Sequence, residues 1–227
     1  MNKNLIEVKK LNKQFKNNNS IIKVLKNINL KLESGKLIAL TGPSGSGKST
    51  FLHLLALLDK PTKGEIVLLG KKTENISEEQ KNLMIRDNIS IIFQNNNLLS
   101  DFTSLENVAI PLIIRGNNYN SSIKKAAKIL SRVNLGHRLD HFPSDLSGGE
   151  QQRVAIARSL ASDTSIILAD EPTGNLDEKT SEEVFSYFLK LKQKNKTILI
   201  ATHNRELARR ADYTLRLSDG NIKRVNA

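Results

Sequence analysis

The sequence predicts an α/β protein with a mainly parallel core sheet. Three short apolar runs, at 89–93, 166–169 and 198–201, have the near-continuous hydrophobic character of strands that are buried on both faces. Between the strands, segments such as 121–134 and 181–194 carry apolar residues every three or four positions, which is typical of amphipathic helices. Strands that alternate with helices along the chain favour a parallel sheet with helices packed on its faces.

Further strands are expected toward both ends of the chain. Residues 5–11 and 24–32 form two runs rich in apolar residues with a polar loop between them, and 37–40 is a short apolar strand that ends in a glycine-rich turn. Near the carboxyl terminus, an Asp-Gly turn joins 213–217 to 221–225, which predicts a hairpin.

Capping signals mark where two of the helices begin. Ser77 is followed three residues later by Gln80, and Thr103 by Glu106. In this spacing each side chain satisfies a free backbone N–H at the start of a helix. The two capping boxes predict a short helix that ends near Arg86 and a second helix over 104–114.

Length and composition limit the class of protein. The chain has 227 residues, a net charge of +12 and no cysteine, so disulfides and thiolate metal ligands are excluded. Its longest apolar stretches, 51–58 and 108–114, are far shorter than the ~18 residues of a membrane span, and the amino terminus lacks the apolar core of a signal peptide. The two halves share the excess charge equally, and the lysines accompany a general richness in asparagine. We therefore expect no nucleic-acid partner.

A phosphate-binding motif follows the strand at 37–40. Residues 42–49 read GPSGSGKS and match G-x-x-x-x-G-K-[ST]. Glycines let backbone N–H groups point at phosphate oxygens, and the positive end of the following helix adds to the same place. We expect Lys48 to reach the β and γ phosphates and the Ser49 hydroxyl to bind Mg²⁺. The residues predicted to bind the nucleotide here are Gly42, Pro43, Ser44, Gly45, Ser46, Gly47, Lys48, Ser49 and Thr50.

Two carboxylates end the strand at 166–169. Asp170 and Glu171 are placed at the carboxyl edge of the sheet, where α/β proteins bind ligands. Asp170 is predicted to hold Mg²⁺ through its water shell. Glu171 is predicted to accept the proton of a water that attacks the γ phosphate.

A second anion cradle lies about 100 residues after the first. Residues 146–149 read LSGG and precede a helix predicted over 151–161. With these motifs in this order, the sequence resembles the ATP-binding-cassette (ABC) ATPases over essentially its whole length. The resemblance implies a phosphate-loop NTPase fold, with an antiparallel β subdomain beside the core sheet and a helical subdomain, about 95–162, that carries the LSGG signature. It implies one domain over 1–227.

The resemblance also implies ATP as substrate, Mg²⁺ as cofactor and a homodimer in the ATP-bound state. In such a dimer, Ser147, Gly148 and Gly149 of one chain cover the γ phosphate that the other chain holds. Two copies would therefore enclose two ATP molecules.

Four more residues match positions of the family. Phe15 corresponds to an aromatic ring that stacks on adenine, and Gln94 to a glutamine that contacts Mg²⁺ or the attacking water and couples the site to the membrane partner. Asp177, in the string GNLD, corresponds to an aspartate that faces the partner subunit. His203 corresponds to the histidine that hydrogen-bonds the γ phosphate; many members have Asp next, whereas this chain has Asn204.

Within the family, the segments 94–116 and 170–177 look like the subgroup of lipoprotein-releasing, macrolide-efflux and cell-division ATPases (LolD, MacB and FtsE), and most like the first. This implies a peripheral protein on the cytoplasmic face of the bacterial inner membrane. It would drive two integral membrane subunits (LolC/LolE-like) that pass lipoproteins to a periplasmic carrier, with the cargo handled indirectly.

Other functions of this family stay open. A cell-division ATPase is also a free cassette of this size, whereas MacB-type efflux is disfavoured because MacB is fused to its membrane domain. DNA-repair and chromosome-organising ATPases share the signature but insert long coiled coils between the nucleotide motifs. Here Lys48 and Asp170 are 122 residues apart with no heptads.

Overall fold

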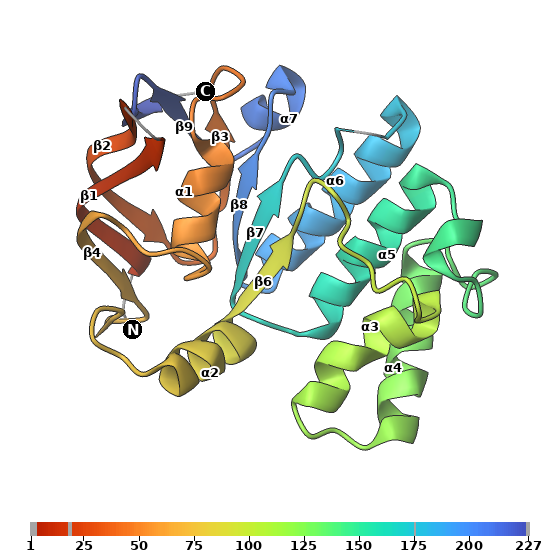
Figure 1. Cartoon of the computed structure of the whole chain (residues 1–227). Helices are drawn as coiled ribbons and strands as arrows, with labels where there is room; N and C mark the ends of the chain where they lie inside the picture. The colour runs from red at the N-terminus through yellow and green to blue at the C-terminus, as the bar shows by residue number, and fades with distance from the viewer. Residues whose placement is uncertain (1–3, 18–19, 175, 226–227) are drawn as a thin grey trace.

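The computed structural model describes residues 4–17, 20–174 and 176–225. Figure 1 shows two β-sheets at one side of the molecule and a group of helices at the other. None of the helices in these residues has the length and apolar character of a membrane span.

The larger sheet has the strand order β10-β9-β3-β8-β7-β6. All of its neighbouring strands are parallel except the terminal hairpin of β9 and β10. This arrangement confirms the predicted α/β fold with a mainly parallel sheet. The strands are β3 (Leu37–Thr41), β6 (Ile89–Ile92), β7 (Ile166–Asp170), β8 (Thr197–Ala201), β9 (Tyr213–Ser218) and β10 (Asn221–Val225).

Helices cover both faces of this sheet, as the apolar strands require. Every residue of β7 and β8 is buried. Alternate residues of these strands pack into two separate apolar clusters, one with Phe51 of α1 (Lys48–Leu55) and the other with Phe185 of α6 (Glu178–Gln193). Because successive side chains of a strand point to opposite faces, α1 and α6 lie on opposite sides of the sheet.

The second sheet is antiparallel and has the order β2-β1-β4-β5. Its strands are β1 (Asn4–Asn17), β2 (Ser20–Glu33), β4 (Lys63–Leu68) and β5 (Lys71–Lys72). β1 and β2 extend into the segment predicted as their loop, of which residues 18–19 lie outside the described residues. The sequence prediction missed β4, because only Ile66 and Leu68 in it are buried. This sheet shares its apolar core with α1.

Both predicted capping boxes are present. Side chains of Ser77 and Thr103 cap α2 (Glu78–Asn88) and α3 (Ser104–Ile114), which confirms both helix starts. α3, α4 (Tyr119–Arg132) and α5 (Gly148–Ala161) pack around an apolar cluster of their own, with Val108, Leu130 and Val154 at its centre. The limits 95–162 of a helical subdomain, within one domain over 1–227, stay a prediction.

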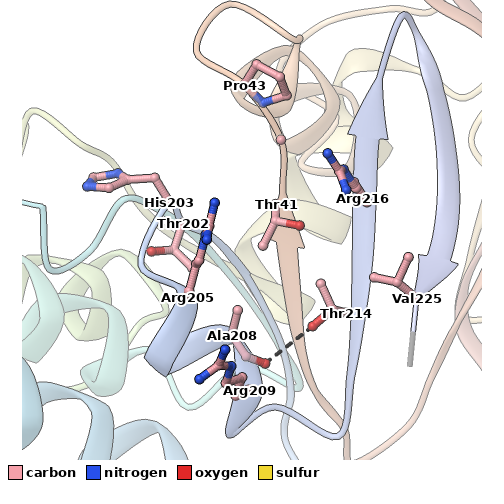
Figure 2. Close-up of a pocket in the computed structure, with 11 residues that line it drawn as sticks. Thr41, Pro43, Thr202, His203, Arg205, Ala208, Arg209, Thr214, Arg216 and Val225 are labelled. Atoms are coloured by element: carbon pink, nitrogen blue, oxygen red, sulfur yellow. Dashed lines mark hydrogen bonds between the residues drawn. The ribbon is translucent and has the colours of Figure 1, made fainter. Parts of the chain in front are cut away.

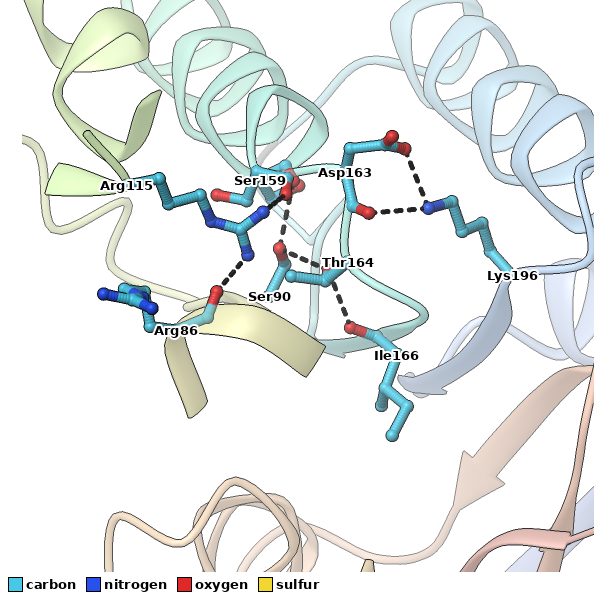
Figure 3. A network of polar contacts seen from close by, with 9 residues as sticks. Arg86, Ser90, Arg115, Ser159, Asp163, Thr164, Ile166 and Lys196 are labelled. Atoms are coloured by element: carbon cyan, nitrogen blue, oxygen red, sulfur yellow. Dashed lines mark hydrogen bonds and ion pairs between the residues drawn. The ribbon is translucent and has the colours of Figure 1, made fainter. Parts of the chain in front are cut away.

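Polar contacts join the helical group to the parallel sheet (Figure 3). Arg115, at the end of α3, donates to the backbone carbonyls of Arg86 and Ser162. Beneath it, Ser90 Oγ of β6 donates to the carbonyl of Ser159 at 3.0 Å, and Thr164 Oγ1 lies 2.7 Å from Ser90 Oγ. These contacts link the ends of α2, α3 and α5 to the start of β6.

We expect the substitution Arg115→Ala to lower the free energy of unfolding by about 1 to 2 kcal/mol. The variant leaves the backbone carbonyls of Arg86 and Ser162 without their charged hydrogen-bond donor, and only a water molecule can replace it. Urea denaturation followed by circular dichroism measures the change. Arg132→Ala is the matched control, because Arg132 is exposed and its guanidinium makes no hydrogen bond or ion pair with the described residues, so its effect is expected within about 0.5 kcal/mol. Equal losses in the two variants would contradict a role of Arg115 at this junction.

Candidate functional site

The phosphate loop connects β3 to α1, and two of its glycines are required by close contacts. A Cβ atom on Gly42 would lie 2.2 Å from the carbonyl oxygen of Leu217, and a Cβ on Gly47 would lie 2.5 Å from Cγ1 of Val24. Gly47 also has a positive φ of 102°, which favours glycine. The loop is thus held between β9 and β2 at points where no side chain fits.

The loop presents several hydrogen-bond donors and one positive charge at the start of α1. α1 begins at Lys48 without a side-chain cap and without an acidic residue in its first turn, so the N–H groups of its first residues, Lys48, Ser49 and Thr50, have no capping acceptor. The Oγ of Ser46 is buried and has no hydrogen-bond partner in the part of the chain that the structure describes. Lys48 Nζ donates to the carbonyls of Gly42 at 3.0 Å and Pro43 at 3.1 Å. This set of donors and positive charge fits an anion with several oxygens. Ser44 and Gly45 lie on the exposed outer side of the same turn.

The neighbouring strands bring two of the predicted catalytic residues together. Glu171 follows β7 and His203 follows β8, and Glu171 Oε2 lies 3.0 Å from His203 Nδ1. The backbone of Glu171 has a left-handed φ of 45°, and its N–H donates to the carbonyl of Ala201 at 2.9 Å. The turn after β7 is therefore fixed to the end of β8, which directs the Glu171 carboxylate at the histidine.

The residues predicted to hold Mg²⁺ come from three separate elements. Asp170, the last residue of β7, is 8% exposed, and its carboxylate makes no hydrogen bond with the described residues. An anionic oxygen that is buried without a donor suits a cation. Ser49 lies in the first turn of α1, and Gln94 is exposed in the loop that follows β6. Their donor atoms, two side-chain oxygens and a carboxylate, are of the kind that Mg²⁺ takes.

The loop of Gln94 is fastened to the helix that begins at the signature. Arg158 of α5 donates to the carbonyls of Asn96 at 2.9 Å and Asn97 at 2.7 Å. Burial lowers the pKa of Arg158 from its ordinary value, because the charged guanidinium loses water.

Phe15 is an exposed ring and not a core residue. It lies on β1 with 42% of its surface exposed, and Lys13 Nζ lies 4.9 Å from the ring centroid. The ammonium of Lys13 is held in place by Asp59 Oδ1 at 2.7 Å. A ring with an open face is available for stacking on a base.

The LSGG signature forms the start of α5. The helix begins at Gly148, earlier than the predicted start at 151, and Ser147 caps it, with its Oγ accepting from the Glu150 N–H at 3.3 Å. A Cβ on Gly148 would meet no atom within 4 Å, so this face of the helix start is open. Gly149 lies against Leu176.

Glu150 makes the reciprocal hydrogen bond of this capping box. Its carboxylate accepts from the backbone N–H of Ser147 at 2.9 Å and from Arg138 Nε at 2.9 Å, and these two donors hold its pKa below the ordinary value.

Asp177 is the N-cap of α6, as Ser147 is of α5. Its carboxylate accepts from the hydroxyl of Thr180 at 2.6 Å and from the Thr180 N–H at 3.0 Å, and these bonds lower its pKa. The side chain is exposed. Of the string GNLD, Asn175 lies outside the described residues.

The structure gathers some of the predicted residues and separates others. Gly42, Pro43 and His203 line one cavity of about 780 Å³ (Figure 2), and Glu171 contacts His203. By contrast, α1 and α5 lie on opposite sides of the molecule, with β6, β7 and α6 between them (Figure 1). The phosphate loop and the signature of one chain therefore do not meet.

The same cavity contains residues that sequence reasoning did not find. Arg205 and Arg209 come from α7 (Arg205–Arg209), a short helix that was not predicted, and Arg216 comes from β9. These arginines do not form a sequence motif. They lie at one cavity only because α7 packs against β9. The one local signal for α7 in the sequence is Asn204, whose side-chain oxygen caps the helix by accepting from the N–H groups of Glu206 and Leu207.

The capping box of α5 predicts a dependence on pH. Since the pKa of Glu150 is lowered in the folded protein, its contribution to stability is present above pH 4.5 and is lost as the pH falls below that value. We expect Glu150→Gln to lower the free energy of unfolding by about 1 kcal/mol at pH 7 and by less at pH 4. Urea titrations of both proteins at the two pH values measure the difference. A difference that does not shrink in acid would contradict the assignment.

Comparison with known proteins identifies the family. The family pattern described as ABC transporter matches residues 25–174. The lipoprotein-releasing system ATP-binding protein LolD of Rickettsia bellii is 49% identical over 222 residues, which cover 97% of this chain and 98% of that protein. An uncharacterized ABC transporter ATP-binding protein of Methanocaldococcus jannaschii is 45% identical, with 97% of this chain and 99% of that protein covered.

A solved structure agrees in fold. The ATP-binding cassette MJ0796, in a dimeric post-hydrolysis state bound to ADP and Pi, has a TM-score of 0.94 and 39% identity, with 97% of this chain and 98% of that chain covered. The matched family segment contains both the phosphate loop and the LSGG signature. The chain therefore belongs to the ABC transporter family, as an ATP-binding cassette with ATPase activity.

Proposed function

We propose that two copies of this chain close on two ATP molecules and that hydrolysis drives membrane subunits of a lipoprotein-releasing (LolCDE-like) complex. The observation that carries the dimer is the separation of the two anion cradles. The phosphate loop begins α1 and the signature begins α5, on opposite sides of one chain. Because both cradles suit a phosphate, a second copy is needed to bring a signature to each phosphate loop.

In this arrangement, the phosphate loop of one chain holds the nucleotide. Lys48 leaves the carbonyls of Gly42 and Pro43 and donates to the β and γ phosphates instead. The N–H groups at the start of α1 and the hydroxyl of Ser46 donate to other phosphate oxygens. Phe15 stacks on adenine with its exposed face.

The second chain contributes the open face of its α5. Gly148 leaves room there for a phosphate, and the Ser147 hydroxyl and the N–H groups of Gly148 and Gly149 supply donors. Asp177 is exposed at the start of α6 and faces the other copy.

Glu171 serves as the base that orients the attacking water and accepts its proton. Its carboxylate is only 12% exposed and already has His203 at 3.0 Å. On ATP binding, His203 turns from Glu171 to the γ phosphate, and the carboxylate is released to the water. Asp170, Ser49 and Gln94 would hold Mg²⁺, which when bound neutralises phosphate charge.

The lipoprotein-releasing role rests on likeness to proteins of that name. Several near-full-length relatives are named LolD, among them those of Rickettsia bellii and of Acinetobacter baylyi, the latter at 43% identity. We infer LolC/LolE-like integral membrane subunits as partners, with this chain peripheral at the cytoplasmic face of the inner membrane. The alternatives are a cell-division ATPase of the FtsE type and the ATPase subunit of a MacB-type system. The Methanocaldococcus jannaschii relative, named only as an ABC transporter protein, favours none of the three.

We expect Glu171→Gln to bind ATP but to lose at least about 100-fold in the rate of hydrolysis, because the amide cannot accept the proton. The variant should then accumulate as an ATP-bound dimer, which size-exclusion chromatography with light scattering detects. Lys48→Ala is the contrasting variant and should lose nucleotide binding, so no dimer is expected with ATP. Hydrolysis at the wild-type rate in Glu171→Gln would show that another group is the base.

Purification of the tagged chain from its native membranes tests the assignment to a complex. Two large membrane subunits with sizeable periplasmic domains, together with ATP-dependent release of a lipoprotein from reconstituted vesicles, are expected. A single short polytopic partner would instead identify the cell-division function. Recovery of Glu171→Gln with the same subunits but without release would tie the release to hydrolysis.

A further inference from the structure

Three arginines line the cavity beside the phosphate loop and have no partner among the described residues. Arg205 and Arg209 come from α7 and Arg216 from β9, and no Asp or Glu of the described part of the chain lines the cavity of about 780 Å³. None of the three guanidinium groups makes a hydrogen bond or an ion pair with residues 4–17, 20–174 or 176–225. The cavity therefore concentrates positive charge that the described part of the chain does not compensate.

Two nearby arginines, in contrast, form ion pairs with acidic side chains. Arg210, the residue that follows α7, pairs with Glu182 through Nη1, at 2.6 and 2.7 Å from its two carboxylate oxygens. Arg224 on β10 pairs with Glu33 at 3.3 Å. The acid closest in sequence to Arg209, apart from Glu206, is Asp212, and it is engaged by Lys192 at 2.7 Å and by the N–H of Leu37 at 2.8 Å. Arg210 and Arg224 are thus paired with acidic residues, whereas the three arginines that face the cavity have no acid within reach among the described residues.

The side chains reach the cavity from two directions. Figure 2 shows Arg205 and Arg216 on either side of Thr41, with Arg209 lower on α7 beside Ala208. Thr202 also lines the cavity; its Oγ1 accepts from the Asn204 N–H at 3.0 Å, and its hydroxyl hydrogen stays available. Guanidinium groups that approach from separate elements can each donate to a different oxygen of one tetrahedral anion.

We propose that this cavity, which lies against Gly42 and Pro43 of the phosphate loop, is a second phosphate site and that it binds a phosphate dianion through Arg205, Arg209 and Arg216. Bringing three like charges to one cavity is unfavourable, and a dianion removes most of that repulsion. The cavity is larger than a phosphate ion and falls within the range of small-molecule sites. The phosphate group therefore comes either from inorganic phosphate, which hydrolysis releases next to Pro43 and His203, or from a small phosphate monoester in solution.

Calorimetric titration of the nucleotide-free full chain with inorganic phosphate tests the proposal. The titration is made in the Lys48→Ala background, so that the phosphate loop contributes little. Saturable binding is expected, and Arg209→Gln/Arg216→Gln in the same background should weaken it at least about tenfold for each arginine removed. Binding should also weaken as the salt concentration rises.

The matched control is Lys128→Gln/Arg132→Gln, which removes two exposed positive charges from α4 and should leave phosphate binding unchanged. Thermal melting and ATP binding, measured for the same pairs in the Lys48 wild-type chain, show that the cavity variant is folded and that its nucleotide site is intact. Phosphate binding that disappears in Lys48→Ala, or that survives loss of Arg209 and Arg216, would overturn the proposal. Since no hydrolysis is measured, this result is independent of the proposed transport function.

A second titration distinguishes the two sources. Glycerol 3-phosphate carries the same dianion on a small organic group. Tighter binding of inorganic phosphate would identify the hydrolysis product as the ligand, whereas tighter binding of the ester would identify a phosphorylated metabolite. Absence of binding for both, in a chain that is folded, would contradict the site.

Discussion

The close packing of the phosphate loop between β2 and β9 is the constraint on which the rest of the site depends. Gly47 lies against Val24 and Gly42 against the carbonyl of Leu217, at distances that exclude a Cβ. The antiparallel sheet therefore presses on the loop from one side and the parallel sheet supports it from the other. With the loop fixed in this way, α1 starts at the carboxyl edge of β3. Its neighbour β8 in the sheet, and β7 beyond it, bring His203 and Glu171 to the same edge.

The contact between Glu171 and His203 joins a fixed side chain to a mobile one. The histidine side chain is 73% exposed, whereas the glutamate is 12% exposed, so the glutamate is held by the sheet and the histidine is free to turn away from it. The left-handed backbone at Glu171 is a strained conformation for a residue with a side chain. It is maintained by the hydrogen bond to Ala201, which belongs to the same β8 that carries His203. One strand thus sets the position of both residues.

Much of this could be predicted from the sequence, because the informative residues are local signals. The phosphate loop, the capping boxes at Ser77 and Thr103, and the buried strands each depend on a few consecutive residues. What could not be predicted depends on packing between distant segments. β4 carries too few buried residues to stand out, α7 is one short turn, and the arginines of the cavity come from separate elements. The exposure of Phe15 likewise follows from its place near the end of β1, beside the exposed Ile22 of β2, and not from its residue type.

The two hydrogen bonds from Arg158 have a mechanical consequence. They tie the carbonyls of Asn96 and Asn97, close to Gln94, to the helix whose first turn is the LSGG signature. Because a partly buried guanidinium loses free energy when it is separated from its acceptors, a movement of α5 is coupled to a movement of the loop after β6. The loop of Gln94 and the helix that begins at the signature are therefore connected, so that a displacement of the open helix start is transmitted to the carboxyl end of β6.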